Sequence, residues 1–286
     1  MELFLDLLRS VVYGVIEGIT EWLPISSTGH MILAEQVLKF SLSAEFMEMF
    51  RVVIQLGAIM AVVVLYFKKL WPFCGDNGCD SGLAKHIRWP VLRLWLKIIV
   101  ACLPAAVLGL LLDDWMDAHF YNSVVVAVML IVYGIAFILI ERRPRVPATT
   151  KLSRITYKQA IIIGAWQVLA LIPGTSRSGA TIIGGLLCGM SRACASQFTF
   201  FLAIPVMAGA SGLKLVKFLV GGGVFTVAEV GALLVGCIVA FVVSIMAVRF
   251  LMDYVKKHTF TIFASYRIAL GILVLGIWAL QTFVLA

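Results

Sequence analysis

Two polar runs interrupt an otherwise apolar chain: EGITEWLPISSTGH at residues 17–30 and QVLALIPGTSRSGAT at residues 167–181. In each run we expect an apolar helix to end at a proline, Pro24 or Pro173, and a loop of hydroxyl residues and glycine to lead into a second apolar helix. Ionised side chains in hydrocarbon are costly unless polar partners or a ligand join them. The two runs therefore set the expected architecture and the place to look for a site.

The composition is that of an integral membrane protein. Of the 286 residues, 62% are hydrophobic and 13% are charged, and the mean hydropathy is +1.04. Water-soluble domains average about 45–50% apolar and about 25% charged residues. Apolar stretches near the roughly 20 residues that cross a bilayer recur along the chain, and the segments of about 10 alternating residues typical of a β-barrel are not seen. We expect an all-α polytopic membrane protein.

The net charge of +8 does not predict nucleic-acid binding, because Lys and Arg lie in short loops between apolar stretches, as the positive-inside rule expects. Six transmembrane helices are predicted, at residues 46–67, 91–112, 122–140, 196–213, 225–249 and 266–285. Loop charge assigns the loops after the first, third and fifth spans to the cytoplasm and leaves both chain ends outside. Cys74 and Cys79 share the first of these loops and are therefore expected to form no disulfide.

Each polar run belongs to a segment that we predict to enter the membrane and return as a re-entrant hairpin, at residues 3–39 and 157–192. Non-helical backbone at that depth is tolerated only inside protein or along a wet cavity. We therefore expect a single membrane domain over residues 1–286, made of a first repeat at 1–145 and a second at 151–286, each with one hairpin and three spans.

A shift of 150 positions supports the repeat, since it aligns Glu17 with Gln167 and Ser26 with Ser176. Three crossings per repeat invert the second repeat relative to the first. The hairpins would then enter from opposite faces and meet near the midplane. Paired broken segments of this kind are the best sequence indication of a binding site in inverted-repeat membrane proteins.

Two acids share one helix face of the first hairpin. Glu17 and Glu21 are four positions apart, which is about one helical turn. Inside a bilayer they would need a cation, a base or a shared proton, so they are candidate ligands of a divalent metal ion. The alternative is a water-exposed acidic pair near the outer surface.

Hydroxyl residues start the helix that follows. Ser26, Ser27 and Thr28 precede Gly29 and His30, and N-capping is the simplest role for at least one of the three hydroxyls. The same helix start offers free N–H groups and the positive end of a dipole, which favour an anion. His30 could reach that anion, the alternative being a buried histidine with satisfied hydrogen bonds.

The second run repeats this design and adds a cation. Thr175, Ser176 and Ser178 offer hydroxyls, and Arg177 lies among them after the Pro173 break. An arginine suits bidentate recognition of phosphate and stays charged when desolvated, whereas one that extends to the interface would be structural. Together the two runs predict a site for a phosphate or diphosphate that carries a long apolar tail, with a divalent cation on the acids. In-line hydrolysis there would need a nucleophile, charge stabilisation on the phosphoryl oxygens and an acid–base group.

Other polar residues inside apolar stretches are weaker signals. Glu48 and Arg51 lie near the outer end of the first span and are interpreted as a pair or as interface contacts. Gln55 and Arg267 are interpreted as end anchors or as helix–helix hydrogen bonds.

At these motifs the chain resembles the undecaprenyl-diphosphate phosphatase family, also called the bacitracin-resistance protein family. EGITEWLPISSTGH and PGTSRSGAT are similar to its two signatures. The likeness extends through VVIQLGAI at residues 52–59, FLAIPVMAGA at 201–210 and SYR at 265–267, and so covers nearly the whole chain. Two long motifs in the right order and spacing make this resemblance specific.

The resemblance implies hydrolysis of undecaprenyl diphosphate to undecaprenyl phosphate at the outer side of the bacterial inner membrane, which recycles the lipid carrier for peptidoglycan and confers bacitracin resistance. The functional residues that it implies on this chain are Glu17, Glu21, Ser27, His30, Ser176, Arg177 and Thr181. Either Ser27 or His30 would be the nucleophile, and Arg177 would clamp the diphosphate. The acids would hold Mg²⁺ or Ca²⁺, or help to position the attacking group.

The residues expected to bind the substrate are Ser26, Thr28, Ser176, Ser178 and Thr181. The assembly is left open, with a homodimer as one option.

The main alternative is a transporter or flippase of a polyprenyl phosphate lipid, because inverted repeats with a midplane site are transporter architecture. A lipid phosphatase of the soluble-histidine type would need a further histidine after Arg177. The next one, His258, lies in a basic loop assigned to the cytoplasm, so this type is excluded.

Overall fold

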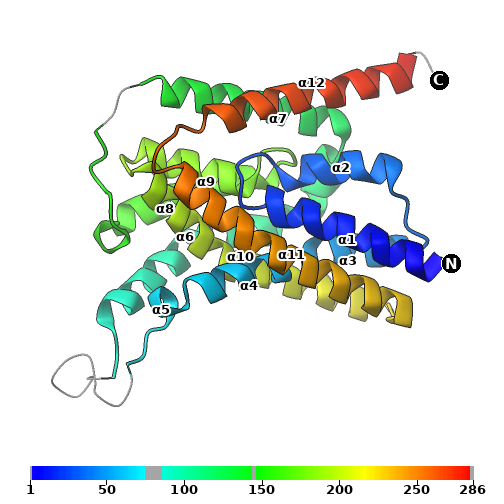
Figure 1. The fold of residues 1–286 in the computed structure, drawn as a ribbon, viewed down its shortest axis with the longest axis horizontal. Coiled ribbons are helices and arrows are strands. Elements are labelled where there is room, and N and C mark those ends of the chain that lie inside the picture. The colour runs from blue at the N-terminus through cyan, green and yellow to red at the C-terminus, as the bar shows by residue number, and fades with distance from the viewer. Residues whose placement is uncertain (1, 75–85, 144–145, 284–286) are drawn as a thin grey trace.

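The computed structural model describes residues 2–74, 86–143 and 146–283, which are mostly helical and contain no β-strand (Figure 1). The α-helices of this part are α1 Glu2–Thr20, α2 Ser27–Val37, α3 Ala44–Val53, α4 Gln55–Leu65, α5 Phe67–Leu70, α6 Trp89–Phe120, α7 Ser123–Glu141, α8 Tyr157–Val168, α9 Arg177–Leu187, α10 Arg192–Val220, α11 Val227–Tyr254 and α12 Thr261–Phe283. Two short 3₁₀ helices, η1 Leu152–Arg154 and η2 Leu169–Leu171, complete the described helices.

Six candidate spans are long and apolar enough to cross a membrane, within the described residues: Ala44–Leu65, Trp89–Leu112, Ser123–Glu141, Arg192–Val220, Val227–Tyr254 and Thr261–Phe283. The prediction of an all-α protein with six transmembrane helices is therefore confirmed. The last three helices are longer than the predicted stretches, since α10 extends beyond its stretch at both ends, α11 continues to Tyr254 and α12 begins at Thr261. Ser191 caps α10, and Thr226 caps α11 in a capping box with Glu229.

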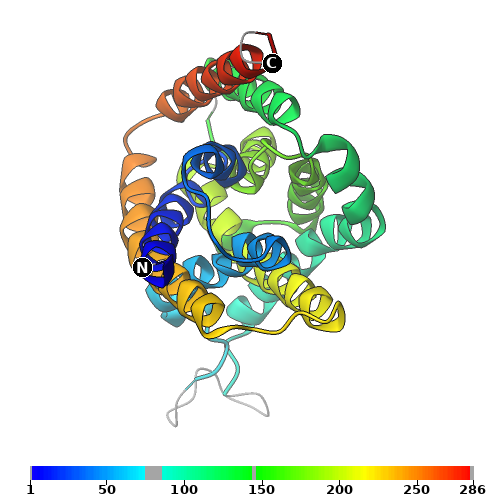
Figure 2. The same cartoon turned by 90° about the vertical axis from the view of Figure 1, so that its right-hand side faces the viewer.

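Both ends of the described chain lie on one side of the molecule. The N-terminal end of α1 and the C-terminal end of α12 are at the same end of the molecule (Figure 1), and Figure 2 looks onto that end. In both views α7 and α12 lie side by side along one edge. This arrangement agrees with six crossings that leave both termini on one side.

Close helix packing depends on small residues, as is usual in membranes, where apolar burial gives helices little drive to associate. A Cβ added to Gly57 on α4 would lie 2.1 Å from the carbonyl oxygen of Cys237 on α11. A Cβ at Gly164 on α8 would lie 2.3 Å from the carbonyl oxygen of Ala101 on α6. Backbones at these two crossings are in direct contact, so the helices cannot accept a side chain there without moving apart.

The two polar runs form matching interruptions. One separates α1 from α2, and the other separates α8 and η2 from α9. A serine with positive φ immediately precedes each second helix, with φ 71° at Ser26 and 70° at Ser176. Among the described residues these are the only non-glycine residues with positive φ. They are the two serines that the shift of 150 positions aligns. Re-entry of the two helix pairs and the division into repeats at 1–145 and 151–286 stay predictions, with which this match agrees.

Cys74 corrects one expectation. It was predicted with Cys79 to form no disulfide, because loop charge assigns their loop to the cytoplasm, but Cys74 is disulfide-bonded. Cys79 lies outside the described residues. Loop charge reports topology and carries no direct information on thiol pairing.

Candidate functional site

A single arginine of α12 holds the two interrupted turns together. Arg267 is fully buried, and its guanidinium donates to the carbonyl oxygens of Pro24 at 3.1 Å, Gly174 at 3.0 Å and Thr175 at 2.8 Å. The first carbonyl belongs to the first polar run and the other two belong to the second. Gly174 has φ +90°, and a Cβ there would lie 2.5 Å from the carbonyl oxygen of Val126, so this turn requires glycine. Arg267 thus fixes the relative position of both turns.

A buried ion pair then joins the two runs. Nη2 of Arg177 lies 2.7 Å from Oε1 of Glu21, and the two side chains are 12% and 8% exposed. Nη1 of Arg177 donates to the carbonyl oxygen of Thr199 on α10 at 2.9 Å. The other carboxylate oxygen of Glu21, Oε2, accepts the hydroxyl proton of Ser27 at 3.0 Å. Glu21 therefore links the arginine of one run to the serine of the other.

Glu17 lies one helical turn before Glu21 and is 1% exposed. Its Oε1 is buried without a hydrogen-bond partner. A buried carboxylate oxygen without a partner is costly, so this position calls for a proton or a ligand. Gln167, the aligned residue of the second run, is also buried, and neither atom of its amide has a partner.

The serines at the two helix starts act as N-caps. Oγ of Ser26 accepts from the backbone N–H of Gly29 at 3.4 Å, and Oγ of Ser176 accepts from that of Gly179 at 3.2 Å. The hydroxyl of Ser178 lies 3.1 Å from that of Ser176. The capping role considered for these hydroxyls is thus present, and it leaves further N–H groups of α2 and α9 directed at the site.

Four predicted site residues, Ser26, His30, Ser178 and Thr181, lie outside the linings of the two cavities beside the ion pair. Thr181 donates to the carbonyl oxygens of Arg177 at 2.9 Å and Ser178 at 3.2 Å, and the hydroxyl of Thr199 lies 2.9 Å away. Its contacts support the first turn of α9, which carries Arg177. Ser178 also approaches the carbonyl oxygen of Leu23, at 3.4 Å, and so contacts the first turn.

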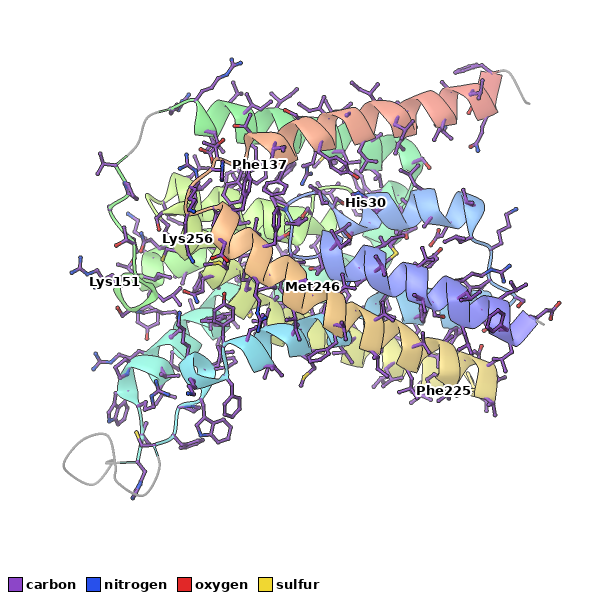
Figure 3. The ribbon with its side chains drawn as sticks, in the orientation of Figure 1. His30, Phe137, Lys151, Phe225, Met246 and Lys256 are labelled. Atoms are coloured by element: carbon purple, nitrogen blue, oxygen red, sulfur yellow. The ribbon has the colours of Figure 1, made fainter. Side chains whose placement is uncertain are left out.

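His30 lies on α2 between α1 and the α7–α12 pair (Figure 3). Its Nδ1 is 2.7 Å from the carbonyl oxygen of Ser26, and its Nε2 is 2.7 Å from the hydroxyl oxygen of Tyr266. Since a carbonyl only accepts, these partners assign the proton to Nδ1 and leave Nε2 to accept from the tyrosine. Both ring nitrogens are therefore engaged, and one of them holds the positive-φ residue in place.

The ion pair faces a cavity of about 190 Å³. Its polar lining consists of Glu21, Ser27, Thr28, Gln55, Ser176 and Arg177. A second cavity, of about 680 Å³, shares Ser27, Thr28 and Gln55 and also includes Glu17, Arg51 and Lys214. Arg51 pairs with Glu35, and Lys214 pairs with Glu48 at 2.7 Å. The smaller space can hold a phosphate group beside Arg177 and Glu21, and the larger one adds room beside Glu17.

Sequence reasoning missed the roles of Gln55 and Arg267. Gln55 lines both cavities, and Arg267 joins the two turns, although it also makes longer bonds to carbonyl oxygens of α7 at 3.4 and 3.5 Å. The available signal was a polar residue inside an apolar span. Such residues are rare because they are costly in a membrane, and those that occur usually have a function.

The acids fit a cation that shares its ligands with the substrate. Among the described residues, no group of three or more His, Cys, Asp and Glu side chains could hold a metal ion. Mg²⁺ is commonly bound by one or two carboxylates together with substrate phosphates and water. Glu17 and Glu21 supply that donor set, and the partnerless oxygen of Glu17 is the feature that favours a ligand.

Residues 10–273, which include both polar runs, match the family described as Bacitracin resistance protein BacA. The chain belongs to this family. It is 58% identical over 278 residues to an undecaprenyl-diphosphatase of Enterococcus faecalis, covering 96% of this chain and 99% of the relative. It is 56% identical to an undecaprenyl-diphosphatase of Lactococcus lactis, covering 95% and 96% of the two chains. An undecaprenyl-diphosphatase of Streptococcus thermophilus is 55% identical, with 95% and 93% covered. The family resemblance read from the motifs is therefore confirmed.

Proposed function

We infer that this protein hydrolyses undecaprenyl diphosphate to undecaprenyl phosphate and inorganic phosphate. Membership of the family and near full-length similarity to undecaprenyl-diphosphatases support this function. The observation that carries it is the contact chain from Arg177 through Glu21 to Ser27 at one cavity. These contacts support the proposal that a fixed cation, a base and a hydroxyl nucleophile act on the terminal phosphate of the substrate.

In this proposal Ser27 is the nucleophile. Glu21 takes the hydroxyl proton, and Oγ attacks the terminal phosphorus in line with the bridging oxygen. The bond between that phosphorus and the bridging oxygen breaks, undecaprenyl phosphate leaves, and the proton passes to the departing phosphate. Water then gives a proton to Glu21 and its hydroxide attacks phosphorus. The bond to Oγ breaks, and Glu21 returns the proton to the serine oxygen.

The geometry favours Ser27 over His30 for this step. Ser27 lines the cavity and donates to a carboxylate, whereas both nitrogens of His30 are engaged by Ser26 and Tyr266. His30 would then hold the strained turn that presents Ser27. Arg177 and the N–H groups that start α2 and α9 would stabilise charge on the phosphoryl oxygens.

A divalent cation, Mg²⁺ or Ca²⁺, is part of the proposal. Glu17 and Glu21 would hold it, with the remaining ligands from the diphosphate and water. When bound it would neutralise charge on the phosphate oxygens.

The protein is a multi-pass protein of the bacterial inner membrane. We propose that the active site opens on the outer side, where the reaction recycles the carrier lipid for peptidoglycan synthesis and confers bacitracin resistance. Support comes from the larger cavity, which includes Tyr121 between α6 and α7. Loop charge places that connection outside. Assembly as a homodimer stays a prediction that cross-linking in native membranes would test.

Phosphate release from undecaprenyl diphosphate by the purified protein in detergent micelles tests the function. A micelle has no second compartment, so a transporter or flippase that does not hydrolyse its lipid would release no phosphate. Arg177→Ala is expected to lower turnover at least about 100-fold, as is typical of removing a main charge stabiliser. Lys158→Ala, at an exposed position of α8, is the control and should turn over normally. Normal turnover by folded Arg177→Ala would refute the site.

A further inference from the structure

A basic cavity lies between helix ends and shares no lining residue with the two cavities of the candidate active site. It has a volume of about 660 Å³ and is formed by α5, the end of α11, the starts of α6 and α10, and η1. Its cationic lining is Lys69, Arg88, Lys151 and Lys256. No Asp or Glu is among its described lining residues, and Leu94 and Met252 contribute to an apolar wall.

This cavity lies at the level of a membrane surface. Lys151 and Lys256 lie towards one end of the molecule and Phe225 towards the other (Figure 3), and loop charge assigns the lysine end to the cytoplasm. Large exposed aromatic side chains lie on the elements around the cavity, with Trp71 47% and Trp89 45% exposed. Exposed tryptophans of this kind are typical of the headgroup region of a bilayer. The cavity therefore opens where lipid headgroups lie.

The positive-inside rule alone does not account for the arrangement. That rule accounts for cations on loops in water, but here basic residues from four separate segments line the same cavity. Arg88 is fixed, because its guanidinium donates to the carbonyl oxygens of Lys68 at 2.6 Å and Trp71 at 3.1 Å. Lys256 also pairs with Asp253, at 2.8 Å on the exposed surface. Gathered like charges repel unless an anion lies among them.

We propose that this cavity binds the phosphate headgroup of an anionic phospholipid from the cytoplasmic leaflet, with the acyl chains lying along the apolar wall. Basic pockets between transmembrane helices on the cytoplasmic side are suited to such headgroups. Arg88 provides a rigid donor to the phosphate, and the three lysines adapt to its oxygens. This site is separate from the active site and does not depend on the proposed hydrolysis.

Two pairs of neighbouring lysines give a matched test. All four are exposed, but Lys69 and Lys256 line the cavity, whereas Lys68 and Lys257, their neighbours in the chain, are not in its lining. Binding of phosphatidylglycerol and of phosphatidylcholine with the same acyl chains would be measured by native mass spectrometry of the detergent-solubilised protein. Phosphate release from undecaprenyl diphosphate checks that each variant is folded, and it should be unchanged.

The wild type should prefer phosphatidylglycerol, and Lys69→Gln/Lys256→Gln should bind it about 30-fold more weakly, since each cation near a lipid surface contributes about 1 kcal/mol. Lys68→Gln/Lys257→Gln should bind it as the wild type does. Equal weakening in both double variants, or no preference for the anionic lipid, would overturn the proposal. Displacement of the lipid by millimolar inorganic phosphate would also overturn it, because the cavity would then select a free anion.

Discussion

The ion pair between Glu21 and Arg177 allows a quantitative test of how the two turns are coupled. Both side chains are nearly buried, at 8% and 12% exposure, and their atoms are 2.7 Å apart. Removing one partner of a buried pair typically costs about 3–5 kcal/mol, because the other charge is left uncompensated. We expect Glu21→Gln to cost about 3 kcal/mol, since the amide oxygen still accepts from the guanidinium, and Arg177→Gln to cost up to about 5 kcal/mol.

The double variant Glu21→Gln/Arg177→Gln should cost about 1–3 kcal/mol less than the sum of the single variants, because it leaves neither charge unpaired. The free energy of unfolding would be measured for all four proteins by reversible sodium dodecyl sulfate titration in mixed micelles. Phosphate release by the same samples should be at least about 100-fold lower in every variant, including the double one. Costs that add within about 0.5 kcal/mol would show that the two groups are not coupled. Recovery of turnover in the double variant would refute the catalytic role of the pair.

Ser27→Ala should lower phosphate release at least about 100-fold with little change in thermal stability, and turnover near the wild-type rate would exclude a serine nucleophile. Arg267→Lys should lower both thermal stability and turnover, because one ammonium cannot reproduce the fork that reaches both turns; unchanged values for both would contradict its bridging role. Gly57→Ala should destabilise by about 1–3 kcal/mol through overpacking against α11, whereas Gly209→Ala, where an added Cβ meets nothing within 4 Å, should be neutral or stabilising. Chelation with EDTA should abolish phosphate release and added Mg²⁺ should restore it; full activity in the chelator would argue against the cation.

The sequence carried most of the fold because a bilayer imposes strong rules. Long apolar stretches and basic loops were enough to predict the six spans, and the proline breaks with their hydroxyl residues marked where the chain is interrupted. The approach of the two runs followed from the repeat, and the contact between Glu21 and Arg177 agrees with it. The pattern of hydrophobicity could not predict in which direction each side chain of the turns points.

Roles that depend on three-dimensional contacts were therefore missed. A lone arginine in an apolar helix, such as Arg267, has the same sequence pattern whether it extends to the interface or binds carbonyl groups at the centre. The family resemblance implies that Thr181 is a functional residue, which stays a prediction, and the sequence did not show that its hydroxyl contacts the backbone of its own helix and Thr199. A threonine in a helix can bond the preceding turn or face outward, and the sequence does not distinguish the two.

The guanidinium of Arg267 belongs to neither turn, yet it holds carbonyl groups from both. A transport cycle in which one half of the molecule moves against the other would break the hydrogen bonds of this charge at a fully buried position. Because an uncompensated buried charge costs several kcal/mol, the two turns should travel as one body. The lipid then has to reach a site whose two turns do not move relative to each other. Alternating access, which requires such movement, is disfavoured.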